Sequence, residues 1–463
     1  MNVRTIAWML AVALAAAAPA RAQGGSTLGA PSPFMGSAPR GAATAEPLLL
    51  SVKDAVDRAL QFNLGLLLQE EAAKTAHGAR WRALADLLPN LSATAGESRQ
   101  VINLAAYGFP TDHPIVGPFN VFDTRVYLSQ PVLDLQALNQ SRAASANERA
   151  EVLGIRTARD LVTLVAVNLY LESVAAASRI DAARAQQATA DALFKQASDM
   201  KQAGLIAGID VLRTQVQIQN QRQRAIRADN DFEKSKLQLA RAIGLPAGQP
   251  ITLTDKIPYA PLADVTLESA LKTAFESRAD YLAARERLAA AEASRRAAVG
   301  ERLPTLHLDA DYGAIGQTPD SAHSTYRIAA TVRVPIFEGG KATAHRIESE
   351  SLLRQRQAEV EDFKGRVEYD VRAALLDVRA ATQQLEAAQT NTTLAGQELE
   401  QARDRFAAGI AGNLEVTQAQ ETVAAASENF IAALYAHNLA KATLARAVGT
   451  AEQSISAFLG GMK

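Results

Sequence analysis

The sequence contains no cysteine, few aromatic residues and almost no net charge. Without cysteine the chain has no disulfide, no thiolate metal site, no cysteine nucleophile and no N-terminal cysteine to carry a lipid anchor. The balance of 48 Lys+Arg against 49 Asp+Glu argues against a protein that holds nucleic acid through its phosphates. Aromatic residues make up only 5% of the chain, although apolar residues reach 48%. Such a surplus of small apolar residues favours long, closely packed helices over a compact globular core.

The first residues have the pattern of an export signal. Arg4 precedes an apolar run over residues 6–18, and Ala20-Arg21-Ala22 fits the small-x-small pattern of a cleavage site. Those 13 apolar residues are too few to span a bilayer as a helix. We therefore expect residues 1–22 to be a signal peptide and residues 23–47, rich in Gly, Ala, Pro and Ser, to be a flexible leader. The mature protein then lies beyond the inner membrane.

No later segment is a convincing transmembrane helix. The best candidate, residues 161–177, contains Asn168 and Glu172 and has charged residues at both ends. A carboxylate at bilayer depth is costly, so a buried stretch of coiled coil explains this segment better.

The chain repeats itself in two halves. Residues 88–91 match residues 303–306 at an offset of 215, and residues 241–244 match residues 446–449 at an offset of 205. Several matches in the same order, with one local change of offset, make chance similarity between Ala-rich helices a poor explanation.

The offset changes between two pairs of prolines that we expect at the four helix–strand junctions. Pro89 and Pro131 are 42 residues apart, whereas Pro304 and Pro335 are 31 apart. The first half therefore carries an 11-residue insertion, which belongs in an exposed loop. The expected division is a first repeat (48–250), an equatorial linker between the repeats (251–264), a second repeat (265–450) and a C-terminal tail (451–463).

Between each proline pair, apolar and polar residues alternate with the period of two that is typical of a strand. Two strands are expected within residues 90–131 and two within residues 305–335. Tilted strands of this length can cross a bilayer, with the apolar face toward lipid and the polar face toward a watery lumen. In the clearest strand the predicted lipid-facing residues are Tyr326, Ile328, Ala330, Val332 and Val334.

Four strands cannot close a barrel, and open sheet edges are not tolerated in lipid. Three copies of the chain would supply twelve strands, and two copies would supply eight, which leaves little lumen. The alternative is a pair of soluble hairpins on a helical protein, although hairpins with uncovered apolar faces are marginally stable. The export signal favours the membrane interpretation.

The rest of the chain is predicted to be helical, so the fold class is mainly α with a membrane β part and an internal twofold repeat. Residues 133–202 and 343–407 contain no proline, and each is expected to form a helix of roughly 100 Å. Ser51 and Asp54 resemble a capping box at the start of the first helix. Shorter helices are expected over residues 51–87, 210–243, 266–302 and 414–448.

Two turns and two strand-to-helix junctions form matching pairs of motifs that are specific enough to indicate a protein family. Glycine-bearing turns at residues 203–212 and 408–416 match each other, and strand-to-helix junctions containing proline occupy residues 129–134 and 334–340. With these motifs, residues 48–450 resemble the TolC-type outer membrane efflux proteins.

This resemblance implies a homotrimer in the outer membrane of a Gram-negative bacterium, with a twelve-stranded β-barrel continuous with a long α-helical periplasmic barrel. It also implies an equatorial belt made by residues 246–265 and 450–463. The implied partners are outer-membrane lipid, a periplasmic adaptor (membrane fusion) protein and an inner-membrane transporter of RND, ABC or MFS type. The chain would conduct substrate passively, and whether that substrate is a drug, a metal ion or a protein stays open.

The two turns are candidate sites for docking of the adaptor. They are small and apolar, so adjacent hairpins could present a groove to a helical hairpin of the adaptor. The alternative is that glycine merely permits the turn. The candidate residues are Gly204, Leu205, Ile206, Gly208, Gly409, Ile410 and Gly412.

The resemblance also points to a periplasmic gate. In the family, the helix after the second turn carries inward acidic residues, and the matching positions are Glu415 and Gln418. Threefold symmetry would make Glu415 a ring of carboxylates, which favours cations. Asp210 lies at the matching place in the first turn, where Arg213 or Arg405 would have to replace the family's basic partner. The alternative is that Glu415 and Asp210 only stabilise helix dipoles.

The sequence shows no catalytic constellation. The six histidines have no metal-ligand spacing, and neither a G-x-S-x-G motif nor a phosphate-binding loop is present. We therefore expect no enzyme activity, no cofactor and no metal site. The second function class is a structural periplasmic coiled-coil protein without channel activity, which the four alternating strands disfavour.

Overall fold

The structure is a computed structural model that describes residues 32–109, 111–255, 265–410 and 412–453. It divides into two units, Met1–Ser32 and Pro33–Lys463, and the description concerns the second. The predicted signal peptide, the first part of the leader and most of the C-terminal tail lie outside the described residues.

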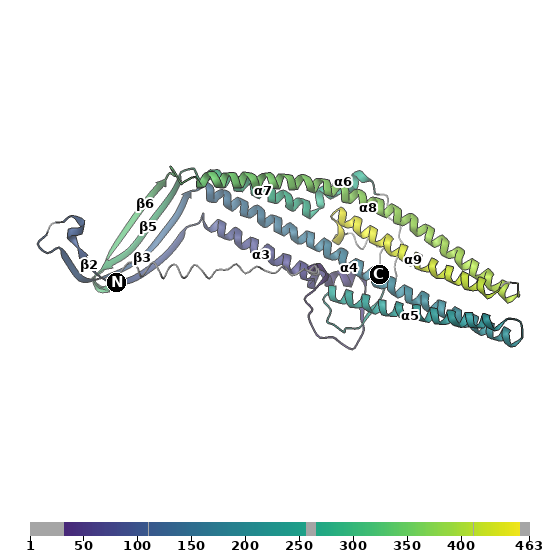
Figure 1. Ribbon diagram of the computed structural model, residues 1–463. Coiled ribbons are helices and arrows are strands. Elements are labelled where there is room, and N and C mark those ends of the chain that lie inside the picture. The colour runs from purple at the N-terminus through teal and green to yellow at the C-terminus, as the bar shows by residue number, and fades with distance from the viewer. Residues whose placement is uncertain (1–31, 110, 256–264, 411, 454–463) are drawn as a thin grey trace, which may run out of the picture. The chain divides into compact units, whose positions relative to one another are not determined.

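Two very long helices run through the unit Pro33–Lys463, and each returns through a shorter helix (Figure 1). They match the predicted helices to within two residues at each end, because an uninterrupted run without proline lets the hydrogen-bond ladder propagate. The bounds are α4 Leu135–Gln202, α5 Gly208–Ala242, α8 Lys341–Ala407 and α9 Asn413–Ala447.

The predicted helices over residues 51–87 and 266–302 are each broken, so the prediction of one continuous helix is wrong in both halves. Asn63 adopts φ −64° and ψ 129°, and its side chain accepts a 2.9 Å hydrogen bond from the Gly65 N–H. Arg278 has a similar backbone, and its guanidinium pairs with Asp280 at 2.7 Å. The predicted capping box at Ser51 is confirmed. The resulting helices are α2 Val52–Phe62, α3 Leu64–Ala85, α6 Leu267–Ser277 and α7 Ala279–Gly300.

The four predicted strands form one antiparallel sheet in the order β2-β3-β5-β6. The register brings residues of like polarity together, as the alternation predicted. Tyr312 lies opposite Val126 on one neighbouring strand and Tyr326 on the other, whereas Asp311 lies opposite Arg327. The apolar face is uncovered, since Tyr326 is 75% exposed. The bounds are β2 Asn90–Asn103, β3 Ile115–Leu133, β5 Thr305–Gly316 and β6 His323–Arg333.

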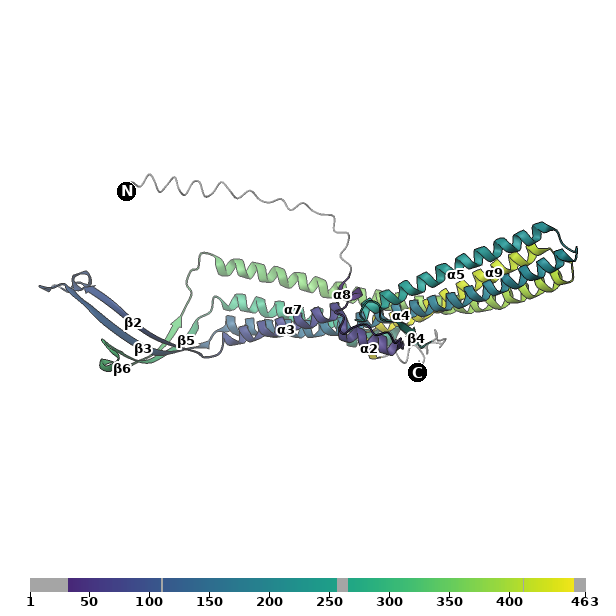
Figure 2. The same cartoon turned by 90° about the horizontal axis from the view of Figure 1, so that it is seen from below.

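The hairpin of β2 and β3 is longer than predicted and extends past the end of β5 and β6 (Figure 2). Pairing of β3 with β5 ends at Phe122, but pairing with β2 continues to Ile115. The predicted insertion falls in this projecting part. Pro131, expected at a junction, lies inside β3 beside a register shift, where its missing N–H breaks no regular ladder bond. Val334 lies just beyond β6.

A small second sheet was not predicted. Strand β1 Leu48–Leu50 pairs in parallel with β4 Ile251–Leu253. The buried hydroxyl of Tyr170, on α4, lies 2.9 Å from the Leu50 carbonyl oxygen and 2.8 Å from the Asp255 carboxylate. Burial, followed by the contact with Asp255, raises the pKa of Tyr170, so the hydroxyl keeps its proton. This contact ties the small sheet to the long helix.

Part of the expected flexible leader is held against the helices. The Asn63 amide donates a 2.7 Å hydrogen bond to the Phe34 carbonyl. The Phe34 ring fills the space beside Gly65, where an added Cβ would lie 2.4 Å from the ring. The leader therefore packs on the break between α2 and α3 from about Pro33 onward.

The core lies along α4 and includes the apolar segment 161–177. Val162, Val167, Tyr170 and Leu171 are all fully buried. Among the described residues α4 is the one helix long and apolar enough to cross a membrane by length and composition, and 61% of its most apolar window is buried inside the fold. The segment thus packs as the core of a helical protein, as the sequence predicted.

Candidate functional site

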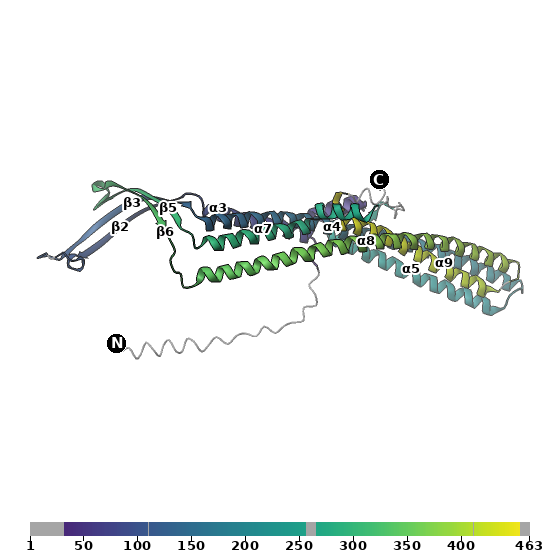
Figure 3. The ribbon, with the colours of Figure 1, turned by 90° about the horizontal axis from the view of Figure 1, so that it is seen from above.

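The two helical hairpins lie side by side, and both of their turns lie at the end opposite the sheet (Figure 3). One hairpin is α4 with α5, and the other is α8 with α9. Near the sheet the neighbouring helices are α3, α4, α7 and α8 in that order, whereas near the turns α4 contacts both α5 and α9. The sequence-predicted docking and gate residues all lie at this turn end.

Both turns close with the same backbone geometry. Gly204 and Gly409 have φ angles of +74° and +73°, a conformation that L side chains rarely adopt. The Leu205 N–H donates to the Met200 carbonyl at 2.9 Å, and the Ile410 N–H donates to the Arg405 carbonyl at 3.0 Å. Glycine adopts this conformation without strain, so it favours the turn itself at these two positions.

The remaining docking candidates are held differently. Gly208 begins α5 and Gly412 caps α9, and neither has a positive φ angle. Leu205 and Ile410 are 70% and 74% exposed, while Ile206 is half-buried. Leu205 and Ile410 therefore each present a solvent-exposed aliphatic side chain at the tip of a hairpin.

The candidate gate residues pair with the two arginines that the sequence singled out. Arg213 lies 3.1 Å from Asp210 within α5. Arg405, at the end of α8, lies 3.0 Å from Glu415 at the start of α9. Gln418 lies exposed one helical turn beyond Glu415. Each acid thus has a basic partner within its own hairpin.

A hydrogen bond links the regions of the two turns. The side-chain amide of Asn413 is 2% exposed and donates to the Asp210 backbone carbonyl at 3.2 Å. The sequence did not single out Asn413, because nothing in its local pattern distinguishes it from a helix-capping residue.

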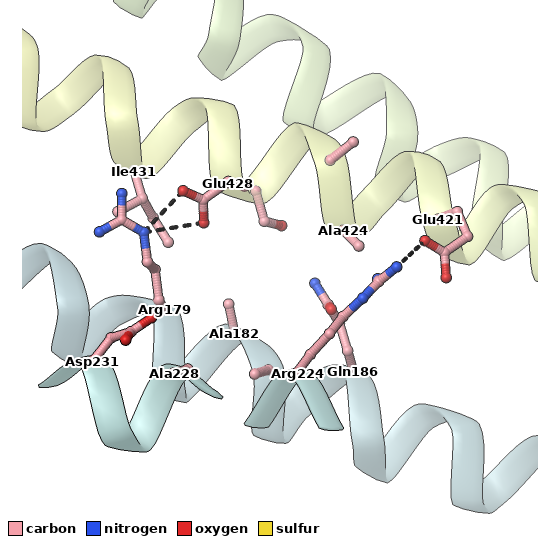
Figure 4. Close-up of a pocket in the computed structure, with 13 residues that line it drawn as sticks. Arg179, Ala182, Gln186, Arg224, Ala228, Asp231, Glu421, Ala424, Glu428 and Ile431 are labelled. Atoms are coloured by element: carbon pink, nitrogen blue, oxygen red, sulfur yellow. Dashed lines mark hydrogen bonds and ion pairs between the residues drawn. The ribbon is translucent and has the colours of Figure 1, made fainter. Parts of the chain in front are cut away.

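A pocket of about 390 Å³ opens between α4, α5 and α9, further along the hairpins (Figure 4). Two ion pairs cross it to α9. Arg179 on α4 lies 2.9 Å from Glu428, and Arg224 on α5 lies 2.5 Å from Glu421. Small residues line its floor: Ala182, Ala183, Ala228, Ala424 and Ala425.

Glu421 accepts two hydrogen bonds in this pocket. Gln217 donates to one carboxylate oxygen at 2.9 Å, and Arg224 donates to the other. Burial raises the pKa of Glu421, but these two donors outweigh burial and hold the pKa below its usual value. The sequence did not point to the two ion pairs of this pocket. Their only signal in the sequence is the seven-residue spacing of the acids Glu421 and Glu428, which places both carboxylates on one face of α9.

Within the described residues, no group of three or more His, Cys, Asp or Glu side chains could hold a metal ion. The arrangement offers exposed apolar tips and ion pairs between helices rather than a reactive centre.

The chain belongs to the outer membrane efflux protein family, whose model matches residues 56–245 and 270–450. It is 24% identical to the outer membrane protein TolC of Vibrio cholerae over 81% of this chain and 86% of TolC. It is 26% identical to the pyoverdine export outer membrane protein OpmQ of Pseudomonas aeruginosa, over 80% of this chain and 79% of OpmQ. The fold matches the CmeC outer membrane channel of Campylobacter jejuni with a TM-score of 0.74 and 17% identity, over 91% of this chain and 95% of CmeC.

The protein is therefore an outer-membrane exit duct of efflux or secretion systems in a Gram-negative bacterium, with a long periplasmic part. It is a channel protein and not an enzyme.

Proposed function

We propose that three copies of the chain form this duct, with a twelve-stranded barrel in the membrane and a twelve-helix tunnel below it. The observation that carries the proposal is the four-stranded sheet, in which β2 and β6 each have one unpaired edge. Unpaired backbone groups are not tolerated in lipid, so the edge strands of neighbouring copies must pair. Three copies give a lumen, whereas two would nearly fill it with side chains.

The edge helices support assembly in the same way. On α5 the apolar residues Ile209, Val216 and Ile226 are more than half exposed, whereas the polar Gln217 and Gln221 are buried. This inverted pattern is costly for an isolated chain and is expected where a neighbouring helix covers the apolar stripe. The opposite edge helix, α8, exposes Leu376 and Leu394, which would meet that stripe in the next copy.

We further propose that the chain is an internal duplication, with the divisions at 48–250, 251–264, 265–450 and 451–463. The nearly equal lengths of corresponding helices in the two halves support the duplication. Helices α2 and α6 have 11 residues, and α3 and α7 have 22. Helices α4 and α8 have 68 and 67, and α5 and α9 have 35 each. Six copies of one repeat would then line the tunnel.

The partners in this proposal are a periplasmic adaptor at the turns and an inner-membrane transporter of RND, ABC or MFS type. The exposed Leu205 and Ile410 supply apolar tips for the adaptor, beside Gly204, Ile206, Gly208, Gly409 and Gly412. The name of OpmQ describes export of pyoverdine. Another relative, the alkaline protease secretion protein AprF of Pseudomonas aeruginosa, is 21% identical over 83% of this chain and 82% of AprF. We infer that the transporter, and not the duct, selects the substrate.

The periplasmic constriction in this proposal is formed by Glu415, Gln418 and Asp210. Glu415 would contribute one carboxylate per copy to a ring at the tunnel end. The ion pairs with Arg405 and Arg213 would partly neutralise the acids and keep the turns in place.

The test is to extract the protein from outer membranes and record its conductance in planar bilayers. The duct predicts a heat-sensitive oligomer on gels and stable single-channel steps. A soluble monomer without conductance would instead support the alternative, a structural periplasmic coiled-coil protein.

A further inference from the structure

Arg125 lies flat on the polar face of the sheet instead of projecting from it. The residue is on β3, which has β2 on one side and β5, followed by β6, on the other (Figure 1). Its Nε lies 3.3 Å from the Asp123 carboxylate on the same strand, and its guanidinium also pairs with Asp311 on β5. Its Nη2 donates to the Thr325 hydroxyl on β6 at 3.1 Å. With only 16% of the side chain exposed, one arginine therefore bridges three strands.

Gly313 leaves the path that Arg125 follows across β5. It lies opposite Arg125 on one neighbouring strand and opposite Thr325 on the other. A Cβ added at Gly313 would lie 2.9 Å from the Cβ of Arg125 and 2.3 Å from the backbone oxygen of Thr124. Any larger residue would therefore displace the arginine or push β3 and β5 apart. Glycine inside a strand often marks such a close approach.

The ion pair of Asp311 is not the one that the strand register favours. Arg327 lies directly opposite Asp311 on β6, where cross-strand partners of opposite charge normally pair. The Asp311 carboxylate nevertheless pairs with Arg125. Arg327 is exposed and makes no ion pair among the described residues. The same face thus carries one arginine held on the sheet and one that is free to extend.

This polar face is the one that the proposed barrel turns toward its lumen. Three copies of the chain would place three Arg125 side chains at one level of that lumen. Extended side chains would narrow the passage there and put three positive charges in the path of the substrate. Held flat over Gly313, the same side chains leave the passage clear.

We propose that Asp311, Gly313 and Thr325 are positioning residues that keep Arg125 against the barrel wall, and that this arrangement sets the free width of the barrel lumen. The inference rests on the proposed function, because only a closed barrel has a lumen. Asp311 contributes most, since its bond to the guanidinium is charge-assisted and both side chains are largely buried, at 14% and 16% exposure.

The first experiment is single-channel recording of a release variant, Asp311→Asn with Thr325→Val, which removes both far contacts of Arg125. We expect the conductance to fall to about half, because three freed guanidinium groups then extend into the lumen. The matched control is Asp309→Asn with Thr331→Val, which makes the same changes on the same strands and face. Asp309 holds no arginine among the described residues and accepts a hydrogen bond from Ser129 at 2.7 Å.

Adding Arg125→Ala to the release variant should return the conductance toward wild type, because the obstructing side chain is then gone. A loss caused only by damage to the barrel would not be rescued by removing a further side chain. Equal conductance in the release and control variants would overturn the proposal. A loss in the release variant that Arg125→Ala does not restore would overturn it as well.

The second experiment is electron cryomicroscopy of the wild-type protein, which needs no variant. Density for the Arg125 side chain should cross β5 at Gly313 and end at Thr325. Density that leaves β3 toward the barrel axis would overturn the proposal even if the release variant fails to insert. Absence of wild-type conductance would refute the proposed duct, whereas a conducting wild type with equal release and control variants refutes this inference alone.

Discussion

The guanidinium of Arg405 lies 3.0 Å from the carboxylate of Glu415, so the end of α8 is tied to the start of α9. Both side chains are about half exposed, which limits the worth of this pair to a fraction of a kcal/mol. Its importance therefore lies in where it places a negative charge, and not in how much it stabilises the turn.

Replacing Glu415 with Gln should reduce the cation selectivity of the channel and weaken block by trivalent cations. The variant removes three carboxylates from the proposed ring but keeps the side-chain length. Selectivity is measured by the reversal potential across a salt gradient in planar bilayers. Asp320→Asn, in the β5–β6 turn at the opposite end, serves as the control. Unchanged selectivity and block would place the constriction at other residues.

The face assignment of β6 is tested by a pair of adjacent substitutions. Val332→Arg puts a charge on the predicted lipid face, which costs about 2–4 kcal/mol near mid-bilayer. Thr331→Arg puts the same charge on the predicted lumen face, opposite His307. We expect the first variant to be depleted from outer membranes and the second to insert normally, as measured in urea-washed membrane fractions. Equal depletion of both variants would contradict the face assignment.

A large side chain at either turn tests the proposal that the adaptor docks there. Gly204→Trp or Gly409→Trp should abolish transport while the level of trimer stays unchanged, because no neighbouring atom lies within 4 Å of a Cβ added at either position. Both glycines have positive φ angles, so any side chain adds backbone strain. Gly204→Asn is therefore the control, since asparagine tolerates this conformation and is small. Transport by both tryptophan variants would show that the adaptor docks elsewhere.

The contact between Tyr170 and Asp255 should stabilise the region around the small sheet. Tyr170→Phe removes one hydrogen-bond donor from the Leu50 carbonyl and the Asp255 carboxylate, which keep the backbone N–H groups of Thr254 and Val52. The loss should lower the free energy of unfolding by about 0.5–1.5 kcal/mol. Tyr281→Phe is the matched control, because Tyr281 is also buried and its hydroxyl has no hydrogen bond among the described residues. Urea denaturation followed by circular dichroism measures both. If both variants lost the same free energy of unfolding, the effect would come from packing and not from the hydrogen bond.

The long helices and the strand faces could be predicted because periodicity encodes them locally. Tyr312 and Asp311 already differ in polarity along the sequence, and the pairing of β5 with β6 brings Tyr312 opposite Tyr326 and Asp311 opposite Arg327. The break at Asn63 was missed, because no proline marks it and the hydrogen bond from the Gly65 N–H to the Asn63 side chain is visible only in the structure.

Contacts between distant parts of the chain were harder to predict. The strand Leu48–Leu50 is three residues long, too short for a periodic signal, and its partner lies about 200 residues away. The pair Arg224–Glu421 depends on how two hairpins cross, which no local pattern reveals. By contrast, the sequence offered Arg213 or Arg405 as the basic partner near Asp210, and Arg213 lies there, one helical turn away along α5. Arg405 pairs with Glu415 instead, across the second turn.

We propose that three copies of this chain close one continuous duct. Electron cryomicroscopy of the oligomer extracted from outer membranes, viewed along its long axis, tests it most directly. We predict threefold symmetry, with β2 of one copy paired to β6 of the next in a closed twelve-stranded barrel. A monomer, a dimer or a sheet with unpaired edges would contradict it.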